Sequence, residues 1–252
     1  FFKQTPAYEI RLSLVGSEMC IRDRSSIVYL RNEVEMLTEF QGNYWLGIHD
    51  EPENTVEKYI QDSFDFYLSD EYPKVIGFEW WFHIMDSSTQ MIALHASHDE
   101  HHRMRTAEMR YPSCTTTTFL NNHLNPSVIM DSYVGKHENE LRDFPPTEAV
   151  YTVPVEGSFL THKPYYIHGV FPSDDIPRVT LEYDVWEEQP ENRRRLGIKS
   201  SIVDCHFIKQ PVSKPMLWLG QTTSLTSTVP STRVSLKRPT YFNEGDFWRV
   251  VQ

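Results

Sequence analysis

Two different periodicities of apolar residues divide the chain. From Asn54 onward, apolar residues recur at i, i+3, i+4, i+8, i+11 and i+12, which places them on one face of a helix. Asn54 and Glu57 have capping-box spacing at its start, and Pro73 follows its end. A shorter helix is predicted over 27–40, and both are expected on the outer face of a sheet. The members of the stripe are Val56, Tyr59, Ile60, Phe64, Tyr67 and Leu68.

From Lys74 the pattern changes to runs of β-branched and aromatic residues. Ser, Asn, Pro, Asp and Gly separate these runs, and no segment of helix length lies between them. Such a pattern is typical of an all-β sandwich or a barrel-like jelly roll. Residues 200–208 are a candidate for one more strand. The seven predicted strands are 75–85, 90–97, 113–120, 126–132, 149–155, 157–170 and 178–186.

These patterns give a division of the chain into four parts. Residues 13–24 read SLVGSEMCIRDR, which looks like a translated adaptor or assembly scar, so 1–24 is treated as a non-native segment. Residues 25–74 form a helical support and 75–208 the β core. Residues 209–252 are rich in Ser, Thr, Pro and Lys and are predicted to be an irregular extension.

Composition narrows the class of protein. The chain has 252 residues, enough for one domain with additions, and its 14 Phe, 13 Tyr and 6 Trp supply bulk for a core. A net charge of −11 argues against a nucleic-acid partner, and the basic cluster Arg193, Arg194 and Arg195 is interpreted as a solvated turn. No apolar run is long enough to span a membrane, and no signal-peptide pattern is present. Three unevenly spaced cysteines favour a reducing compartment, so a cytoplasmic protein is expected.

Histidines gather inside the β region. Nine of the eleven lie between His83 and His168, and the densest group is LHASHDEHH at 94–102. Imidazole and carboxylate together suit Fe, Mn or Zn. Strand alternation pairs His95 with Asp99 on one face, or His98 with Glu100 on the other. The metallo-β-lactamase-type motif and the HExxH motif are both absent from the sequence.

A second informative segment is YYIHGVFPSDDIPR at 165–178. His168 lies 73 residues after His95, and Arg178 lies ten residues after His168. With EWW (79–81), LHASHDE (94–100), TTTTFL (115–120), IHGV (167–170) and RVTL (178–181), this order resembles the Fe(II)/2-oxoglutarate-dependent oxygenases, in an uncharacterised branch similar to prolyl hydroxylases. The resemblance runs from about Gly77 to Trp186. It implies a mainly β, double-stranded β-helix (jelly roll, cupin-like) with one or two flanking helices.

The resemblance also implies a chemistry. His95 and His168 would ligate Fe(II), Asp99 would supply the carboxylate, and Arg178 would bind the far carboxylate of 2-oxoglutarate. Thr116 and Thr118 share one strand face, and their hydroxyl groups would donate hydrogen bonds to 2-oxoglutarate. O2 would be the second cosubstrate, with ascorbate as a reductant, and the substrate would be a small molecule or peptide, more readily neutral or cationic. The other histidines, His83, His123, His137, His162 and His206, are interpreted as structural, and His101 and His102 as solvated.

One position departs from the family pattern. The carboxylate of the HxD motif falls on Ser97. Either Asp99 takes its place, or His98 and Glu100 form a shifted HxE pair, or the carboxylate is lost. Loss would leave a halogenase-like open position or an inactive site. Two further readings therefore stay open, a non-catalytic jelly-roll binding protein and a cupin-like metalloenzyme without 2-oxoglutarate. The substrate and the oligomeric state are not encoded in these patterns.

Overall fold

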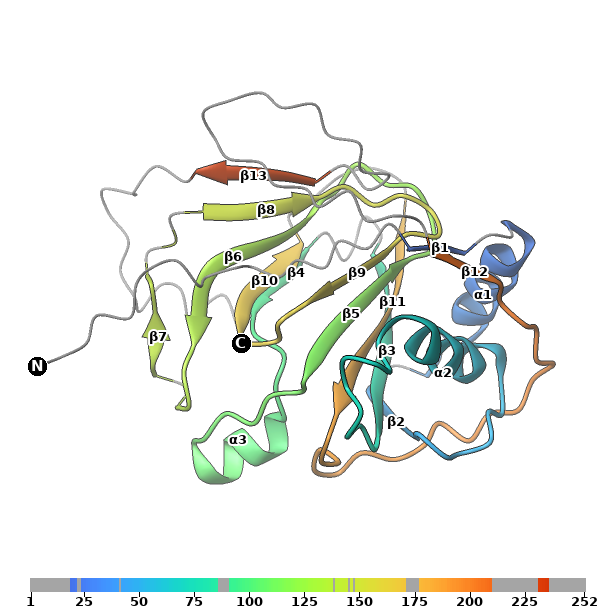
Figure 1. Ribbon diagram of the computed structural model, residues 1–252, viewed down its shortest axis with the longest axis horizontal. Helices are drawn as coiled ribbons and strands as arrows, with labels where there is room; N and C mark the ends of the chain where they lie inside the picture. The colour runs from blue at the N-terminus through green and yellow to red at the C-terminus, as the bar shows by residue number, and fades with distance from the viewer. Residues whose placement is uncertain are drawn as a thin grey trace, which may run out of the picture.

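Two antiparallel sheets face each other in this protein, seen here in a computed structural model (Figure 1). The five-stranded sheet has the order β2-β3-β11-β5-β9, and the six-stranded sheet runs β13-β8-β6-β10-β4 with β7 paired to β6. The structure describes residues 19–21, 24–40, 42–85, 91–137, 139–144, 146, 148–170, 177–209 and 231–235.

The chain alternates between the two sheets as it proceeds. Strands β3, β5, β9 and β11 belong to one sheet, and β4, β6, β8 and β10 belong to the other. This alternation defines a double-stranded β-helix, so the predicted mainly β jelly roll is confirmed. The strands of the first sheet are β2 (Tyr44–Gly47), β3 (Gly77–Met85), β5 (Cys114–Phe119), β9 (Phe159–His162) and β11 (Arg178–Trp186). Those of the second are β4 (Ile92–His95), β6 (Ser127–Val134), β7 (Leu141–Arg142), β8 (Glu148–Thr152), β10 (Tyr166–Val170) and β13 (Ser231–Ser235).

The predicted N-terminal helices are α1 (Arg24–Met36) and α2 (Thr55–Tyr67). The Asn54 side chain accepts a hydrogen bond from Glu57 N at 2.9 Å, which confirms the predicted N-cap. The Glu57 carboxylate accepts from Glu53 N at 2.8 Å rather than from Asn54 N, so the reciprocal bond of the capping box falls one residue earlier. None of the helices in the described ranges is long and apolar enough to span a membrane.

Helices α1 and α2 cover the outer face of the five-stranded sheet (Figure 1). The apolar stripe of α2 packs on β3, where the rings of Phe64 and Phe78 lie 5.0 Å apart, and α1 adds Leu30 and Val34. The opposite face of the same sheet lines the interior of the jelly roll. Because both faces are covered, β11 carries buried residues at nearly every position, and the alternation expected of a half-exposed strand is lost.

Several predicted boundaries are corrected by the structure. Residues 157–170 form two strands, β9 and β10, in different sheets. A helix, α3 (Glu100–Thr106), lies between β4 and β5, where none was predicted. Strand β13 pairs with β8, so the extension 209–252 is not wholly irregular. Strand β1 (Met19–Ile21), inside the excluded segment, pairs with β12 (Phe207–Lys209). Residues 1–18, 210–230 and 236–252 lie outside the described ranges.

Candidate metal and 2-oxo acid site

His95 and His168 lie side by side on β4 and β10. They are direct partners in the antiparallel register, and their ring centroids are 4.4 Å apart. His95 Nδ1 is 2.8 Å from Ala93 O, and His168 Nδ1 is 2.8 Å from Tyr166 O. A carbonyl oxygen can only accept, so in both rings Nδ1 carries the proton and Nε2 carries the lone pair. Metal-binding histidines are held in this way.

The spacing of the two rings suits one metal ion. Two imidazoles bound at right angles to an ion, with metal–nitrogen bonds of about 2.1 Å, would have centroids about 4.6 Å apart. Burial lowers the pKa of His95, and burial together with the neighbouring His162 and His95 lowers that of His168 further. Both rings are therefore neutral at neutral pH, which is the protonation state of a ligand. The sequence-predicted pair is brought together.

Ser97 occupies the place where a carboxylate was sought. It is buried, its backbone N–H donates to Pro164 O at 3.0 Å, and its hydroxyl lies 3.4 Å from His168 Nε2. Since that nitrogen carries a lone pair, the Ser97 hydroxyl is the donor of this long contact. A neutral hydroxyl brings neither the charge nor the basicity of a carboxylate. Ser97 therefore offers a metal ion only a neutral hydroxyl oxygen, which is a weak ligand.

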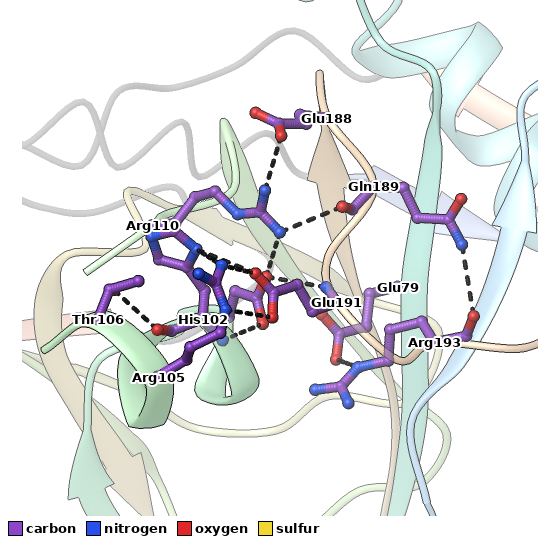
Figure 2. A network of polar contacts seen from close by, with 10 residues as sticks. Glu79, His102, Arg105, Thr106, Arg110, Glu188, Gln189, Glu191 and Arg193 are labelled. Carbon is purple, nitrogen blue, oxygen red and sulfur yellow. Dashed lines mark hydrogen bonds and ion pairs between the residues drawn. The ribbon is translucent and has the colours of Figure 1, made fainter. Parts of the chain in front are cut away.

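The structure does not bring Asp99 to the imidazoles. Strand β4 ends at His95, so strand alternation does not extend to Asp99, which is instead the N-cap of α3. Its carboxylate accepts from the backbone N–H of His102 at 3.1 Å and of Glu191 at 2.9 Å, and it is ion-paired with Arg110. Figure 2 shows the polar network around Arg110 and Glu191. The prediction that Asp99 completes a ligand triad is corrected here, because its lone pairs serve a helix cap.

The alternative HxE pair is also engaged elsewhere. His98 Nε2 and Glu100 Oε2 are 2.7 Å apart, so the two side chains bind each other. Glu100 further accepts two hydrogen bonds from Arg103, at 2.7 and 2.6 Å. These contacts belong to the surface around α3. Across the described ranges, no three His, Cys, Asp or Glu side chains are already arranged to enclose a metal ion.

Arg178 lies at the start of β11 with its guanidinium inside the protein. Only 1% of the residue is exposed. Its Nη2 donates to Ser127 Oγ at 2.8 Å, its Nη1 is 3.6 Å from Met85 Sδ, and the guanidinium carbon lies 5.5 Å from the centre of the Phe119 ring. Burial lowers its pKa to about 10, and Glu182 opposes this. Arg178 is therefore a buried residue and not part of the protein surface.

This buried cation lacks a full set of partners. Among the residues that the structure describes, no carboxylate forms an ion pair with Arg178, and its Nε–H has no hydrogen-bond acceptor. An unpaired buried guanidinium is costly, and a bidentate carboxylate is the ligand that its geometry matches best. The site therefore has the features of an anion-binding pocket.

Thr116 and Thr118, the predicted hydrogen-bond donors to 2-oxoglutarate, point away from the interior of the jelly roll. Thr118 Oγ1 is 2.7 Å from the hydroxyl of Tyr59 on α2, and Thr116 Oγ1 donates to Tyr183 O at 2.8 Å. Both side chains therefore lie on the helix-covered face of β5, and the prediction that they bind 2-oxoglutarate is wrong. The alternation was assigned to the wrong face, because four consecutive threonines give no polarity contrast. Thr117, on the opposite face, lines the interior.

One interior cavity joins these elements. Its lining includes His95, His168 and Arg178, and also Ser127, His162 and Glu182, which sequence reasoning did not assign to the site. Glu182 accepts from Trp81 Nε1 at 3.2 Å and from Thr180 Oγ1 at 3.1 Å. The free volume is about 20 Å³, room for about one water, so a bound 2-oxo acid requires lining side chains to move. The periodicity of β11 was the one signal that could have placed Glu182 on the face of Arg178.

A wider pocket lies further along the same strands. Its volume is about 420 Å³, and its walls include Tyr133 and Tyr166, which are paired across β6 and β10. The carboxylates of Asp131 and Asp143 also line it. Tyr166 lines the wider pocket, and its carbonyl accepts a hydrogen bond from the His168 ring.

Comparisons with known proteins give structural likenesses only. No protein-family model and no curated protein matches the sequence. Among solved structures, a prolyl-4-hydroxylase from Pseudomonas putida aligns at a TM-score of 0.43 and 17% identity, over 68% of this chain and 83% of that chain. A viral collagen prolyl hydroxylase from Paramecium Bursaria Chlorella virus-1 aligns at 0.45 and 10%, over 73% and 98%.

HygX from Streptomyces hygroscopicus, solved with iron bound, aligns at a TM-score of 0.38 and 13% identity, over 68% of this chain and 83% of that chain. At these identities and TM-scores, the likenesses decide nothing about chemistry. That depends on the residues described above.

Proposed function

We propose that this protein is an Fe(II)/2-oxoglutarate-dependent dioxygenase that hydroxylates an unidentified small molecule or peptide. The observation that carries the proposal is the buried Arg178 guanidinium, which has no carboxylate partner among the described residues and lines the same cavity as the His95–His168 pair. A neutral imidazole pair fits a divalent metal, and an unpaired guanidinium fits a carboxylate. A 2-oxo diacid is the ligand that would engage both.

Each residue would have a defined task. His95 and His168 would hold the iron through Nε2, with their Nδ1 protons kept on the carbonyls of Ala93 and Tyr166. Arg178 would bind the far carboxylate of 2-oxoglutarate, with Ser127 holding the guanidinium in place. When bound, iron and 2-oxoglutarate would activate O2 for C–H hydroxylation, with decarboxylation of 2-oxoglutarate to succinate.

The protein's remaining contribution is exclusion of water. Ile129 and Leu160 line the cavity between the two sheets and are 1% and 5% exposed. Such apolar walls strengthen the pairing of Arg178 with a carboxylate, because they lower the local dielectric.

The test is 2-oxoglutarate binding and turnover by the purified protein. Anaerobic calorimetry with Fe(II) should show binding of 2-oxoglutarate, and with O2 and ascorbate the protein should release succinate. Arg178→Ala should abolish both, whereas Arg105→Ala, which alters an exposed arginine on α3, should leave both unchanged. Metal binding without any response to 2-oxoglutarate would instead indicate a cupin-like metalloenzyme.

Ser97 favours a second candidate, a jelly-roll protein that binds without catalysis. A site deprived of its carboxylate has lost one of three ligands on which its geometry depends. If wild-type protein retains neither Fe(II) nor Ni(II), and its melting temperature does not respond to N-oxalylglycine with metal, the oxygenase proposal fails and the non-catalytic one takes its place.

A further inference from the structure

His162 lies against the proposed metal ligands from the opposite sheet. Its ring centroid is 4.3 Å from that of His168, with an interplanar angle of 58°, closely matching the 4.4 Å and 52° between His168 and His95. His162 is 6% exposed and lines the same cavity. Both spacings are near the value of about 4.6 Å for two imidazoles at right angles on one ion.

The path of the chain produces this arrangement. Strand β9 ends at His162 in the five-stranded sheet, and β10 begins at Tyr166 in the six-stranded sheet. The chain therefore crosses the jelly roll between the two histidines, with Pro164 in the connection. Two side chains only six residues apart consequently face each other across the interior, instead of sharing one strand.

The His162 ring is also held in the way that a ligand needs. Its Nδ1 lies 3.1 Å from Lys163 O, so the proton is on Nδ1 and the lone pair on Nε2. All three rings thus donate Nδ1–H to a backbone carbonyl. Ligating histidines almost always have their second ring nitrogen held in this way. His98 has the same contact, with Ala96 O at 2.6 Å, but its Nε2 is bound to Glu100.

We propose that His162 is the third protein ligand of the metal ion held by His95 and His168, in place of the carboxylate that Ser97 does not provide. The inference rests on the proposed function for the site and names a ligand that the sequence resemblance does not supply. In the described ranges no group of three such side chains is placed to hold a metal ion, so the three rings would have to move for this site to form. The ion bound by the three imidazoles would be a divalent cation of borderline hardness, such as Fe(II), Co(II) or Ni(II).

A set of three neutral imidazoles has a consequence for charge. It leaves the two positive charges of the ion uncompensated by protein ligands. The 2-oxo acid, which brings two negative charges, should therefore tighten metal binding more than it does at a site with a carboxylate. Glu182 is the cavity's own acidic side chain, and it already accepts from Trp81 and Thr180.

The first experiment measures metal affinity without 2-oxoglutarate. Co(II) is titrated into the full chain under anaerobic conditions, and binding is followed by its visible spectrum. His162→Ala, His95→Ala and His168→Ala should each weaken binding by at least 10- to 100-fold, the loss typical of changes even in the outer shell. The control His98→Ala, which alters a histidine paired with Glu100, should bind like wild type. Ser97→Asp should restore affinity to His162→Ala.

A second measurement needs no variant, so it does not depend on the folding of a mutant. In the NMR spectrum of the Co(II) protein, each coordinated imidazole gives one exchangeable Nδ1–H resonance that is strongly shifted by the paramagnetic ion. Three such resonances are expected. Two resonances would overturn the proposal while leaving the His95–His168 pair, and hence the proposed function, in place.

Three further outcomes would decide against the His162 proposal, the proposed function, or both. If Glu182→Gln loses Co(II) affinity while His162→Ala keeps it, the third ligand comes from β11 and the His162 proposal is wrong. If none of the three histidine variants changes the affinity, the metal lies elsewhere, and the proposed function falls together with the inference. If wild-type protein binds no Co(II), with or without 2-oxoglutarate, both fail.

Discussion

Arg178 and Ser127 join the two sheets of the jelly roll. Arg178 on β11 donates to the Ser127 hydroxyl on β6 at 2.8 Å, and both residues are almost fully buried. This bond holds a cation in the interior at a place where, among the described residues, no carboxylate pairs with it. A buried charge without an ion-pair partner costs folding stability.

Replacing this cation should therefore separate stability from binding. Arg178→Met keeps most of the apolar volume and removes the buried charge, so the free energy of unfolding of the ligand-free protein should stay the same or rise. Binding of N-oxalylglycine in the presence of Ni(II) should weaken by about 10- to 100-fold, since a hydrogen bond to a charged group contributes about 1.5–3 kcal/mol. Denaturant unfolding and calorimetry measure the two effects. A variant that is strongly destabilised yet binds normally would show that Arg178 has a structural role.

Asp99 should behave as a structural residue. Burial alone would raise the pKa of its carboxyl, but the N–H groups of Glu191 and His102 and the Arg110 guanidinium hold it below the ordinary value. Asp99→Ala removes the N-cap of α3, at a cost of about 0.5–2 kcal/mol, and leaves Arg110 without this partner. Unfolding should become easier while Co(II) affinity stays that of wild type. A loss of Co(II) affinity with unchanged stability would return Asp99 to the metal site.

The lowered pKa of Asp99 in the folded protein determines how its contribution to stability depends on pH. A carboxyl whose pKa is lower in the folded state stabilises the protein above its unfolded pKa, and the stabilisation is lost as the pH falls through the folded value. The difference between wild type and Asp99→Asn should therefore be full at pH 7 and shrink below about pH 4, near the unfolded pKa of an Asp. Denaturant midpoints over this range test it.

Thr118 should contribute to packing of α2 and not to ligand binding. Thr118→Val leaves the Tyr59 hydroxyl buried without its partner, which should cost about 1–3 kcal/mol of unfolding free energy. N-oxalylglycine binding should be unchanged. Thr117→Val, on the cavity face of the same strand, is the matched control and should leave α2 packing intact. Weaker ligand binding in Thr118→Val alone would reverse the assignment of the two faces.

Asp184 should destabilise the protein at neutral pH. Burial raises the pKa of its carboxyl well above the ordinary value, and the neighbouring Glu79 raises it further. An acid with a raised folded pKa contributes its stability below the unfolded pKa and loses it as the pH rises. Asp184→Asn should therefore gain stability over wild type from about pH 4 upward, by about 1.4 kcal/mol per pH unit until the folded pKa is reached. Equal pH profiles for the two proteins would contradict this.

The sequence by itself determined the two N-terminal helices and most of the strands of the jelly roll. The stripe of α2 and its Asn54 cap are local features, as are the β-branched runs, so they could be read directly. The family resemblance implied that His95, His168 and Arg178 share one site, and all three line one cavity: His95 ends β4, His168 lies within β10, and Arg178 begins β11.

Only the tertiary structure decided which faces meet. Residues 115–118 are all threonine, and both faces of their sheet are buried, so no polar contrast marked the interior side. The run 157–170 gave no sign of a crossing between sheets, yet that crossing places His162 opposite His168. In a continuous strand, Asp99 would lie on the same face as His95. The strand ends at His95, however, and Asp99 is the N-cap of α3. Periodicity is a local property of the chain, whereas the assembly of a metal site depends on contacts between strands that are distant in sequence or lie in opposite sheets.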